Sequence, residues 1–291
     1  MIAPRGKRAP RRPLLFGARL LALAAAGALL QCRAAVTPHL QAPPPACAPS
    51  VAVSESRHLA LGVPIDADAS DDLYLDEQAY VLSYNPRRRA PNWVAWRLDR
   101  SDLGKVHRSN DFRADPSLPA PLYRVDESDY RHSGYDRGHL CPSADRSSSA
   151  IDNSRTFLFT NMLPQLHELN AGPWEQLEAF ARLRAKRGQV VYNVAGGVYG
   201  APFHSIGHGV QVPSADFKVL VILNEGESAA DVTAQTCVIA VMMPNEPGVA
   251  QRDWSEYTTS VDAVEAASGY DFLNAIPEPI QRIVEARSSC P

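Results

Sequence analysis

The sequence predicts a single α+β domain built on a central, mostly antiparallel sheet with helices packed against it. Segments typical of strands outnumber segments typical of helices, and the two kinds do not alternate regularly along the chain. Of the 291 residues, 45% are hydrophobic and 21% are charged. This composition supports a large buried core and excludes a chain that is disordered throughout.

The helix with the clearest signal covers Gly172–Gly188. It places Trp174, Leu177 and Phe180 on one face and ends at a glycine. One or two further helices are expected within Asp271–Arg287. Apolar and branched residues, with alternation where one face is polar, predict strands at Ala79–Asn85, Asn92–Leu98, Thr156–Met162, Gln189–Gly200, Phe217–Leu223 and Thr236–Asn245.

Residues 1–35 are typical of a secretory signal peptide. A basic start is followed by the apolar run Leu20–Leu30, which is short for a bilayer span. Cleavage after Ala34 or Ala35, lipidation at Cys32 and an uncleaved signal anchor are the alternatives. The sequence therefore predicts export, to the periplasm or the medium, without a stable membrane span in the remaining chain.

A Pro/Ala-rich tether is expected at 36–57, and the folded domain at 58–291. The signal region carries seven basic and no acidic residues, so the remainder has 22 basic against 32 acidic residues and a formal net charge of −10. Such a chain meets a polyanion only through a local basic patch. The candidate patch, for which a solvated face with ion pairs is the alternative, comprises Arg87, Arg88, Arg89, Arg97, Arg100, Lys105, Arg108, Arg113, Arg124, Arg131, Arg137, Arg146 and Arg155.

Four cysteines remain after removal of the signal region: Cys47, Cys141, Cys237 and Cys290. In an oxidising compartment they permit two disulfides in three pairings. A Cys47–Cys290 bond would join the two ends of the domain. Their spacing does not match a zinc site.

The stretch GYDRGHLCPSADR, residues 134–146, is too polar for a core strand and is expected to form a loop. His139 follows Gly138, whose lack of a side chain lets the backbone come close to a substrate. A neutral imidazole can act as a general base near neutral pH. By itself, a Gly-His pair is more typical of a surface turn than of a catalytic site.

A second set of polar residues lies downstream. If the helix begins between Asn170 and Pro173, then Asn170, Trp174, Glu178 and Arg182 follow one another at four-residue spacing along one face. Trp174 would anchor that face to the core while the polar groups reach a cleft. The simpler alternatives are an N-cap role for Asn170 and a surface ion pair between Glu178 and Arg182.

Together, YDRGHLCPSADR and FTNMLPQLHELNAGPWEQLE resemble the DNA/RNA non-specific endonuclease family, which includes Serratia-type nucleases and endonuclease G. The likeness is strong over about 80–200 and looser beyond. It implies a ββα-metal fold and hydrolysis of DNA and RNA with a divalent cation, usually Mg²⁺, with Mn²⁺ or another divalent ion as alternatives. The resemblance also implies the following roles: His139 as general base, Asn170 as metal ligand, Glu178 as holder of the metal's water shell, Arg137 as the signature arginine, Arg108 as transition-state arginine, Asn161, Gln165 and Arg182 as supporting polar groups, and Asp136 as a residue that orients backbone or water.

These roles agree with the needs of the reaction. A phosphodiester is anionic, so a catalyst must neutralise the charge that develops on the phosphorane and on the leaving 3′ oxygen, and 5′-phosphate products follow. All the groups named address phosphate, metal or water, which predicts low base specificity. Two alternatives remain: a non-catalytic nucleic-acid-binding exported protein, and a phosphodiesterase for a non-nucleic substrate. The sequence leaves a homodimer open and does not indicate an inhibitor.

Overall fold

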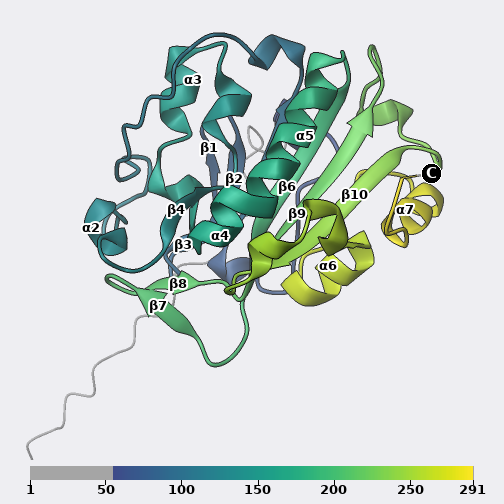
Figure 1. Ribbon diagram of the computed structural model, residues 1–291. Coiled ribbons are helices and arrows are strands. Elements are labelled where there is room, and N and C mark those ends of the chain that lie inside the picture. Colours follow the sequence, from purple (N-terminus) through teal and green to yellow (C-terminus); the bar gives the residue numbers. More distant parts are fainter. Residues whose placement is uncertain (1–54, 291) are drawn as a thin grey trace, which may run out of the picture. The chain divides into compact units, whose positions relative to one another are not determined.

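A computed structural model describes residues 55–290 (Figure 1). The predicted signal region, most of the tether and Cys47 lie outside these residues. The main feature is a seven-stranded sheet in the order β1-β2-β3-β6-β9-β10-β11. All of its neighbouring pairs are antiparallel. Its strands are β1 (Leu73–Asp76), β2 (Val81–Asn85), β3 (Ala90–Leu98), β6 (Val190–Val198), β9 (Ala215–Leu223), β10 (Cys237–Pro244) and β11 (Thr258–Thr259).

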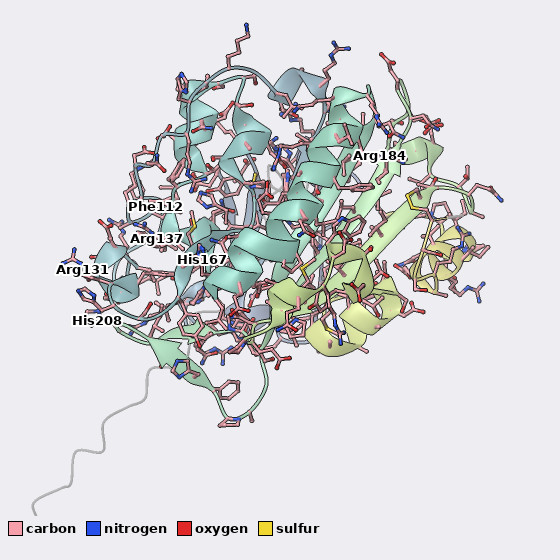
Figure 2. All side chains as sticks on the ribbon, viewed as in Figure 1. Phe112, Arg131, Arg137, His167, Arg184 and His208 are labelled. Atoms are coloured by element: carbon pink, nitrogen blue, oxygen red, sulfur yellow. A yellow bond between two sulfur atoms is a disulfide. The ribbon has the colours of Figure 1, made fainter. Side chains whose placement is uncertain are left out.

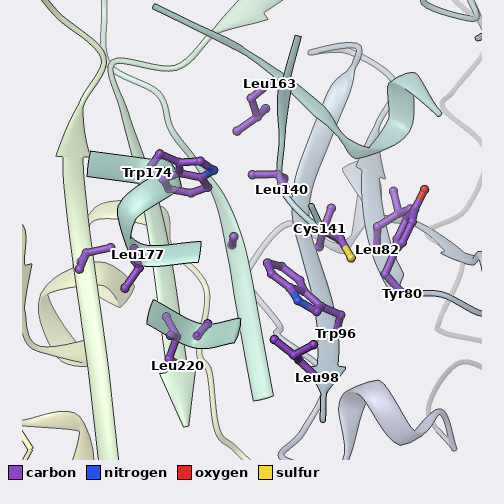
Figure 3. Packing of buried hydrophobic residues seen from close by; sticks show 14 of the residues in the cluster. Tyr80, Leu82, Trp96, Leu98, Leu140, Cys141, Leu163, Trp174, Leu177 and Leu220 are labelled. Carbon is purple, nitrogen blue, oxygen red and sulfur yellow. The ribbon is translucent and has the colours of Figure 1, made fainter. Parts of the chain in front are cut away.

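Successive side chains of each strand point to opposite faces of the sheet, and each face carries a buried apolar core. On β3, Trp96 belongs to the core under helix α5 (Glu175–Lys186), whereas Trp93 belongs to the core on the other face. Figure 3 shows side chains of the first core, among them Trp174, Leu177 and Leu220 of β9. The fold is thus α+β with an antiparallel centre, as predicted.

The second face carries the C-terminal helices. Helix α6 (Val261–Ser268) contributes Val261 and Val264 to this core, and α7 (Glu278–Glu285) contributes Val284. Helix α7 falls within the predicted helical region, but α6 was missed. Within residues 55–290, no helix has the length and apolarity needed to cross a bilayer. The remaining helices are short: α2 (Glu127–Tyr130), α3 (Ala150–Arg155) and α4 (His167–Leu169).

Two hairpins complete the fold. Strands β4 (Asp136–His139) and β5 (Met162–Gln165) pair with each other, as do β7 (His204–Ile206) and β8 (Val210–Val212). The expected loop around His139 is therefore wrong at its start, since the four residues of the DRGH run form β4. A strand this polar is tolerated here because its backbone pairs with β5 and its two charged side chains, Asp136 and Arg137, line an open cleft.

The predicted strand at Thr156–Met162 is also wrong. Helix α3 ends just before this region, at Arg155, a 3-10 turn covers Phe159–Asn161, and β5 begins only at Met162. The turn is held by Asn161, whose side-chain Nδ2 donates to the backbone oxygens of Thr156 and Cys141 at 2.9 and 2.8 Å. This side-chain bonding replaces the ladder that a strand would need, and an aromatic-rich segment gives no local signal of it.

The suggested Cys47–Cys290 pairing is wrong, because Cys290 is bonded to Cys237. Cys237 begins β10, and the segment after α7 runs beside it with the two Cα atoms 4.6 Å apart. Cys141 is buried and has no disulfide partner within residues 55–290. The disulfide therefore fixes the end of the domain to the central sheet.

Candidate active site

The candidate site is built on a β-hairpin followed by a helix. Strands β4 and β5 pair so that Asp136 faces Gln165 and His139 faces Met162. The chain then passes through α4 and an irregular turn, Asn170–Trp174, into α5. The indole Nε1 of Trp174 donates to the backbone oxygen of His139 at 3.0 Å, which ties the helix to the hairpin. This ββα unit places side chains from three elements around one cleft.

Gly138 is needed for the close packing of this unit. A Cβ atom at this position would lie 2.1 Å from Oε1 of Gln165. Gln165 is fully buried, and its Nε2 donates to Asp216 Oδ2 at 2.6 Å, so it has little room to move away. The DRGH strand therefore requires glycine at its third position.

We expect Gly138→Ala to lower the free energy of unfolding by about 1–3 kcal/mol, the usual cost of inserting a methyl group into a packed core. Urea denaturation measures this change. Gly200→Ala is the matched control, because a Cβ at Gly200 meets its nearest neighbour, Ser214 Oγ, at an ordinary 3.6 Å. Equal stability of both variants would contradict the packing argument.

His139 lies in an aromatic pocket at the end of β4. Its ring contacts Phe157 and Phe112 edge-on, with centroids 5.0 and 5.6 Å apart, and only 6% of the residue is exposed. Burial lowers the pKa of the imidazole to about 3; the nearby Arg108 and Arg137 act in the same direction, whereas a backbone hydrogen bond with Arg137 opposes it. Nε2 is buried and has no hydrogen-bond partner within residues 55–290. The geometry thus offers a neutral imidazole with a free ring nitrogen.

The low pKa of His139 affects stability. The unfolded chain takes up a proton at His139 near pH 6.5, whereas the folded chain does so only near pH 3. This contribution to stability is therefore complete above pH 6.5 and is lost as the pH falls, by about 1.4 kcal/mol per pH unit. We expect His139→Gln to lack this part of the slope when the free energy of unfolding is measured between about pH 4.5 and 6.

The control for this pH experiment is His204→Gln at an exposed position on β7. Other groups titrate in the same range, so only the difference in slope between each variant and the wild type is interpreted. A His139→Gln protein with the wild-type slope would show that His139 is not buried in its neutral form.

Two arginines of the predicted patch flank the pocket. The guanidinium carbon of Arg137 lies 4.0 Å from the ring centre of Phe112, and NH1 donates to Glu127 at 2.9 Å. Arg108 lies over Phe157 at 4.9 Å, and its NH1 donates to Ser143 Oγ at 3.0 Å. Figure 2 shows Phe112 and Arg137 close together on one side of the molecule. Cation–π contacts thus hold both positive charges next to His139.

Asn170 lies across the cleft on the irregular turn before α5. Its Nδ2 donates to Asp136 Oδ2 at 2.9 Å, and the same oxygen contacts His167 Nδ1 at 2.8 Å. This arrangement fixes the amide orientation and leaves Oδ1 of Asn170 available as a ligand. Asp136 therefore orients a side-chain amide, where backbone or water was expected. Asn170 makes no capping hydrogen bond in the structure, which argues against the N-cap alternative.

The four-residue line from Asn170 to Arg182 is only partly correct. Gly172 has non-helical angles, φ −108° and ψ −119°, so the regular helix begins at Glu175. Trp174 is 1% exposed and anchors the turn in the core, as predicted. Asn170 therefore lies before the break at Gly172, outside the regular helix, and its side chain bonds to Asp136 of β4.

Glu178 lies in a buried network of charged side chains. Its Oε2 is 3.6 Å from Arg182 NH1, and its Oε1 is 3.7 Å from Lys218 Nζ. Arg182 also contacts Asp145 at 3.3 Å. Burial raises the pKa of Glu178 to about 7, while Lys218 and Arg182 act to lower it. Only 11% and 14% of the Glu178 and Arg182 side chains are exposed, so the surface ion pair alternative does not apply.

Lys218 was missed by the sequence analysis. It is 1% exposed, lies 4.1 Å from the ring centre of Trp174, and has no hydrogen-bond partner within the described residues. The signal was present, since Lys218 and Asp216 are the only charged side chains within the strand-forming run of β9. A charge inside a buried apolar strand usually has a partner. Phe112 and His167, which line the cleft, were also missed, and nothing in the sequence around them indicated a site.

The structure brings some predicted residues to the cleft and keeps others behind it. Asn161 and Gln165 are fully buried and bond to backbone and to Asp216, so they support the hairpin from below. Arg182 supports Glu178. An open cleft of about 440 Å³ is lined by Arg108, Asn110, Phe112, Glu127, Tyr130, Arg131, Tyr135, Asp136, Arg137, His167 and Asn170.

Different members of the predicted basic patch fit its two interpretations. Arg87, Arg97, Arg113 and Arg155 form ion pairs with aspartates, which fits the alternative of a solvated, ion-paired surface. Three other members line the cleft: Arg108, Arg131 and Arg137, the last of which also pairs with Glu127. The local positive charge is therefore concentrated beside His139 and Asn170.

The antiparallel sheet, the ββα unit and the site residues it carries define a ββα-metal nuclease. A family model described as DNA/RNA non-specific endonuclease matches residues 61–278. The chain belongs to this family, and it is an endonuclease.

Individual relatives agree with this assignment. The chain is 42% identical to a nuclease of Nostoc sp. over 246 residues, which cover 82% of this chain and 87% of the relative. It is 33% identical to human mitochondrial endonuclease G over 211 residues, 67% and 68% of the two chains. The crystal structure of an EndoG/EndoGI complex contains a similar chain, with a TM-score of 0.66, 31% identity and coverage of 76% of this chain and 93% of that one.

Proposed function

We propose that this protein is an exported, metal-dependent endonuclease that hydrolyses both DNA and RNA, with His139 as general base. One observation carries the proposal. The buried, neutral His139 has an unpartnered Nε2 near Arg108 and Arg137, and these two arginines line the same cleft as Asn170, whose amide donates to Asp136. This combination suits attack of water on an anionic phosphodiester.

The protein's own groups provide positioning and proton transfer. Nε2 of His139 accepts a proton from the attacking water. Arg108 and Arg137 place positive charge beside the phosphate, and both are held by contacts with Phe157 or Phe112 rather than by strong ion pairs with buried acids. Their charge is thus available to the phosphorane as it forms.

The donor set fits a divalent cation. Asn170 offers a neutral amide oxygen, and Glu178 offers a buried carboxylate at the start of α5. One amide oxygen at the cleft, with a buried carboxylate on the helix that follows, would suit Mg²⁺, which retains most of its water. A cation held there would supply positive charge to the leaving 3′ oxygen. Burial keeps Glu178 close to neutrality, and the bound ion would favour its ionised form.

Low base specificity follows from the same set of groups. The charged side chains of the cleft address phosphate, metal or water, and hydrolysis with a 3′ leaving oxygen gives 5′-phosphate products. Export to the periplasm or medium is supported by the signal-like residues 1–35 and by the Cys237–Cys290 disulfide.

A panel of phosphodiesters tests the proposed substrate class. We expect the purified protein with Mg²⁺ to cleave duplex DNA, single-stranded DNA and RNA, to leave 5′-phosphate ends, and to leave a phospholipid diester intact. Selective cleavage of the lipid would favour the non-nucleic phosphodiesterase. Binding of all three nucleic acids without cleavage would favour the non-catalytic binding protein.

A further inference from the structure

A second cluster of acidic side chains lies on the face of the sheet opposite α5. Asp262 and Glu265 are three residues apart on α6, and Glu285 ends α7. One carboxylate oxygen from each lies within 4.8 Å of the others. Figure 1 shows these two helices, in yellow, next to each other at the C-terminal end of the fold. The cluster therefore bridges two helices that are separate in sequence.

Glu285 is the unusual member. It is only 5% exposed, because the neighbouring Val284 and Ile280 belong to the apolar core under α7. Its Oε1 is buried without a hydrogen-bond partner within residues 55–290. It also lies at the C-terminal end of a helix, where the helix dipole disfavours negative charge. A buried, unpaired carboxylate at this position is costly unless something binds it.

The surroundings supply no positive charge. Within the described part of the chain, none of the three carboxylates forms an ion pair, and Arg282 of α7 contacts Glu278 instead. Glu265 Oε1 accepts from Phe272 N at 2.9 Å, so its second oxygen stays free. Burial raises the pKa of Glu285 to about 7; the Gln281 side chain acts to lower it, and Glu265, Asp262 and Asp271 act to raise it. The three acids repel one another when ionised, and a bound cation would remove that repulsion.

We propose that Asp262, Glu265 and Glu285 form a Ca²⁺ site that ties α7 to α6. The donors are all oxygens, which selects a hard cation, and three carboxylates in an irregular arrangement suit the flexible coordination of Ca²⁺ better than the strict octahedron of Mg²⁺. Water completes the coordination on the exposed side of Asp262. The site and the Cys237–Cys290 disulfide would then both hold the C-terminal end of α7 and the segment that follows it.

Thermal unfolding with and without Ca²⁺ tests the site. The parent protein carries Asn170→Ala, so that the proposed active-site ligand does not contribute to the response. After treatment with chelator, we expect about 5 mM Ca²⁺, in excess of a Kd typical of extracellular modules, to raise the Tm by roughly 2–4 °C. Equilibrium dialysis should give one bound Ca²⁺ per chain.

Three variants in this parent decide the outcome. Glu285→Gln and Asp262→Asn should abolish the rise in Tm and the bound equivalent, and Asp262 is exposed, so its substitution leaves folding intact. Glu278→Gln, on the same helix but outside the cluster, should keep both. Without Ca²⁺, Glu285→Gln should unfold at the same or a higher temperature than the parent, because it removes repulsion. A Ca²⁺ response that persists in both cluster variants, or is absent from the parent, would overturn the proposal.

Discussion

Replacing His139 by alanine is expected to lower kcat for a short duplex DNA substrate by about 10²–10⁴-fold, the usual contribution of a positioned general base. KM should change little, because Arg108 and Arg137, which line the cleft, remain in place. The imidazole is a buried, neutral base on which both of these arginines act. Steady-state kinetics on the oligonucleotide measure the effect.

Removal of a buried ring could also disturb packing, since His139 contacts Phe157 and Phe112. His139→Gln, which keeps more of the side-chain volume, should therefore be as inactive as His139→Ala while unfolding closer to the wild type. His204→Ala on the exposed β7 strand should retain full activity. Wild-type turnover in either His139 variant would remove this residue from the chemistry.

Asn170→Ala should produce the second large loss, of about 10–100-fold or more in activity at fixed Mg²⁺, together with a matching rise in the Mg²⁺ concentration required for half-maximal rate. The substitution removes the amide oxygen that Asp136 orients toward the cleft. Titration of activity with Mg²⁺ separates this effect from a loss of chemistry, since high Mg²⁺ should restore part of the rate.

Asn170→Asp gives a sharper version of the same test. It keeps an oxygen ligand but places a second carboxylate where an N–H now donates to Asp136 at 2.9 Å, so the two acids repel. We expect it to need more Mg²⁺ than the wild type as well. Asn224→Ala, in a surface loop, is the control. An unchanged Mg²⁺ requirement in both Asn170 variants would mean that the cation is held elsewhere.

Much of this fold could be predicted locally. The strands at β2, β3, β6, β9 and β10 and the helix α5 follow from apolar runs and from helical periodicity, because these elements bury a continuous face. Helix α6 was missed, since its eight residues form little more than two turns. The stretch 156–161 was assigned wrongly because Asn161 satisfies its backbone from a distance, and such bonds leave no periodic pattern.

The sequence predicted which residues belong to the candidate site but not the contacts between them. His139, Asn170 and Glu178 were found from the DRGH run, the helix spacing and the family resemblance. The contacts that set their properties come from other elements: Phe112 holds Arg137, Asp136 orients the amide of Asn170, and Lys218 reaches Glu178 from β9. Each of these partners is 25 to 40 residues away from its target along the chain, so the pairs meet only after the fold forms.

The most direct measurement is cleavage of closed circular plasmid and of RNA by the wild-type protein and by His139→Ala, with Mg²⁺ and with chelator. The account predicts that the wild type nicks and then degrades the plasmid and also degrades the RNA, that chelator stops both reactions, and that His139→Ala leaves both substrates intact while still binding them. Cleavage that continues in chelator, or equal cleavage by the two proteins, would contradict it.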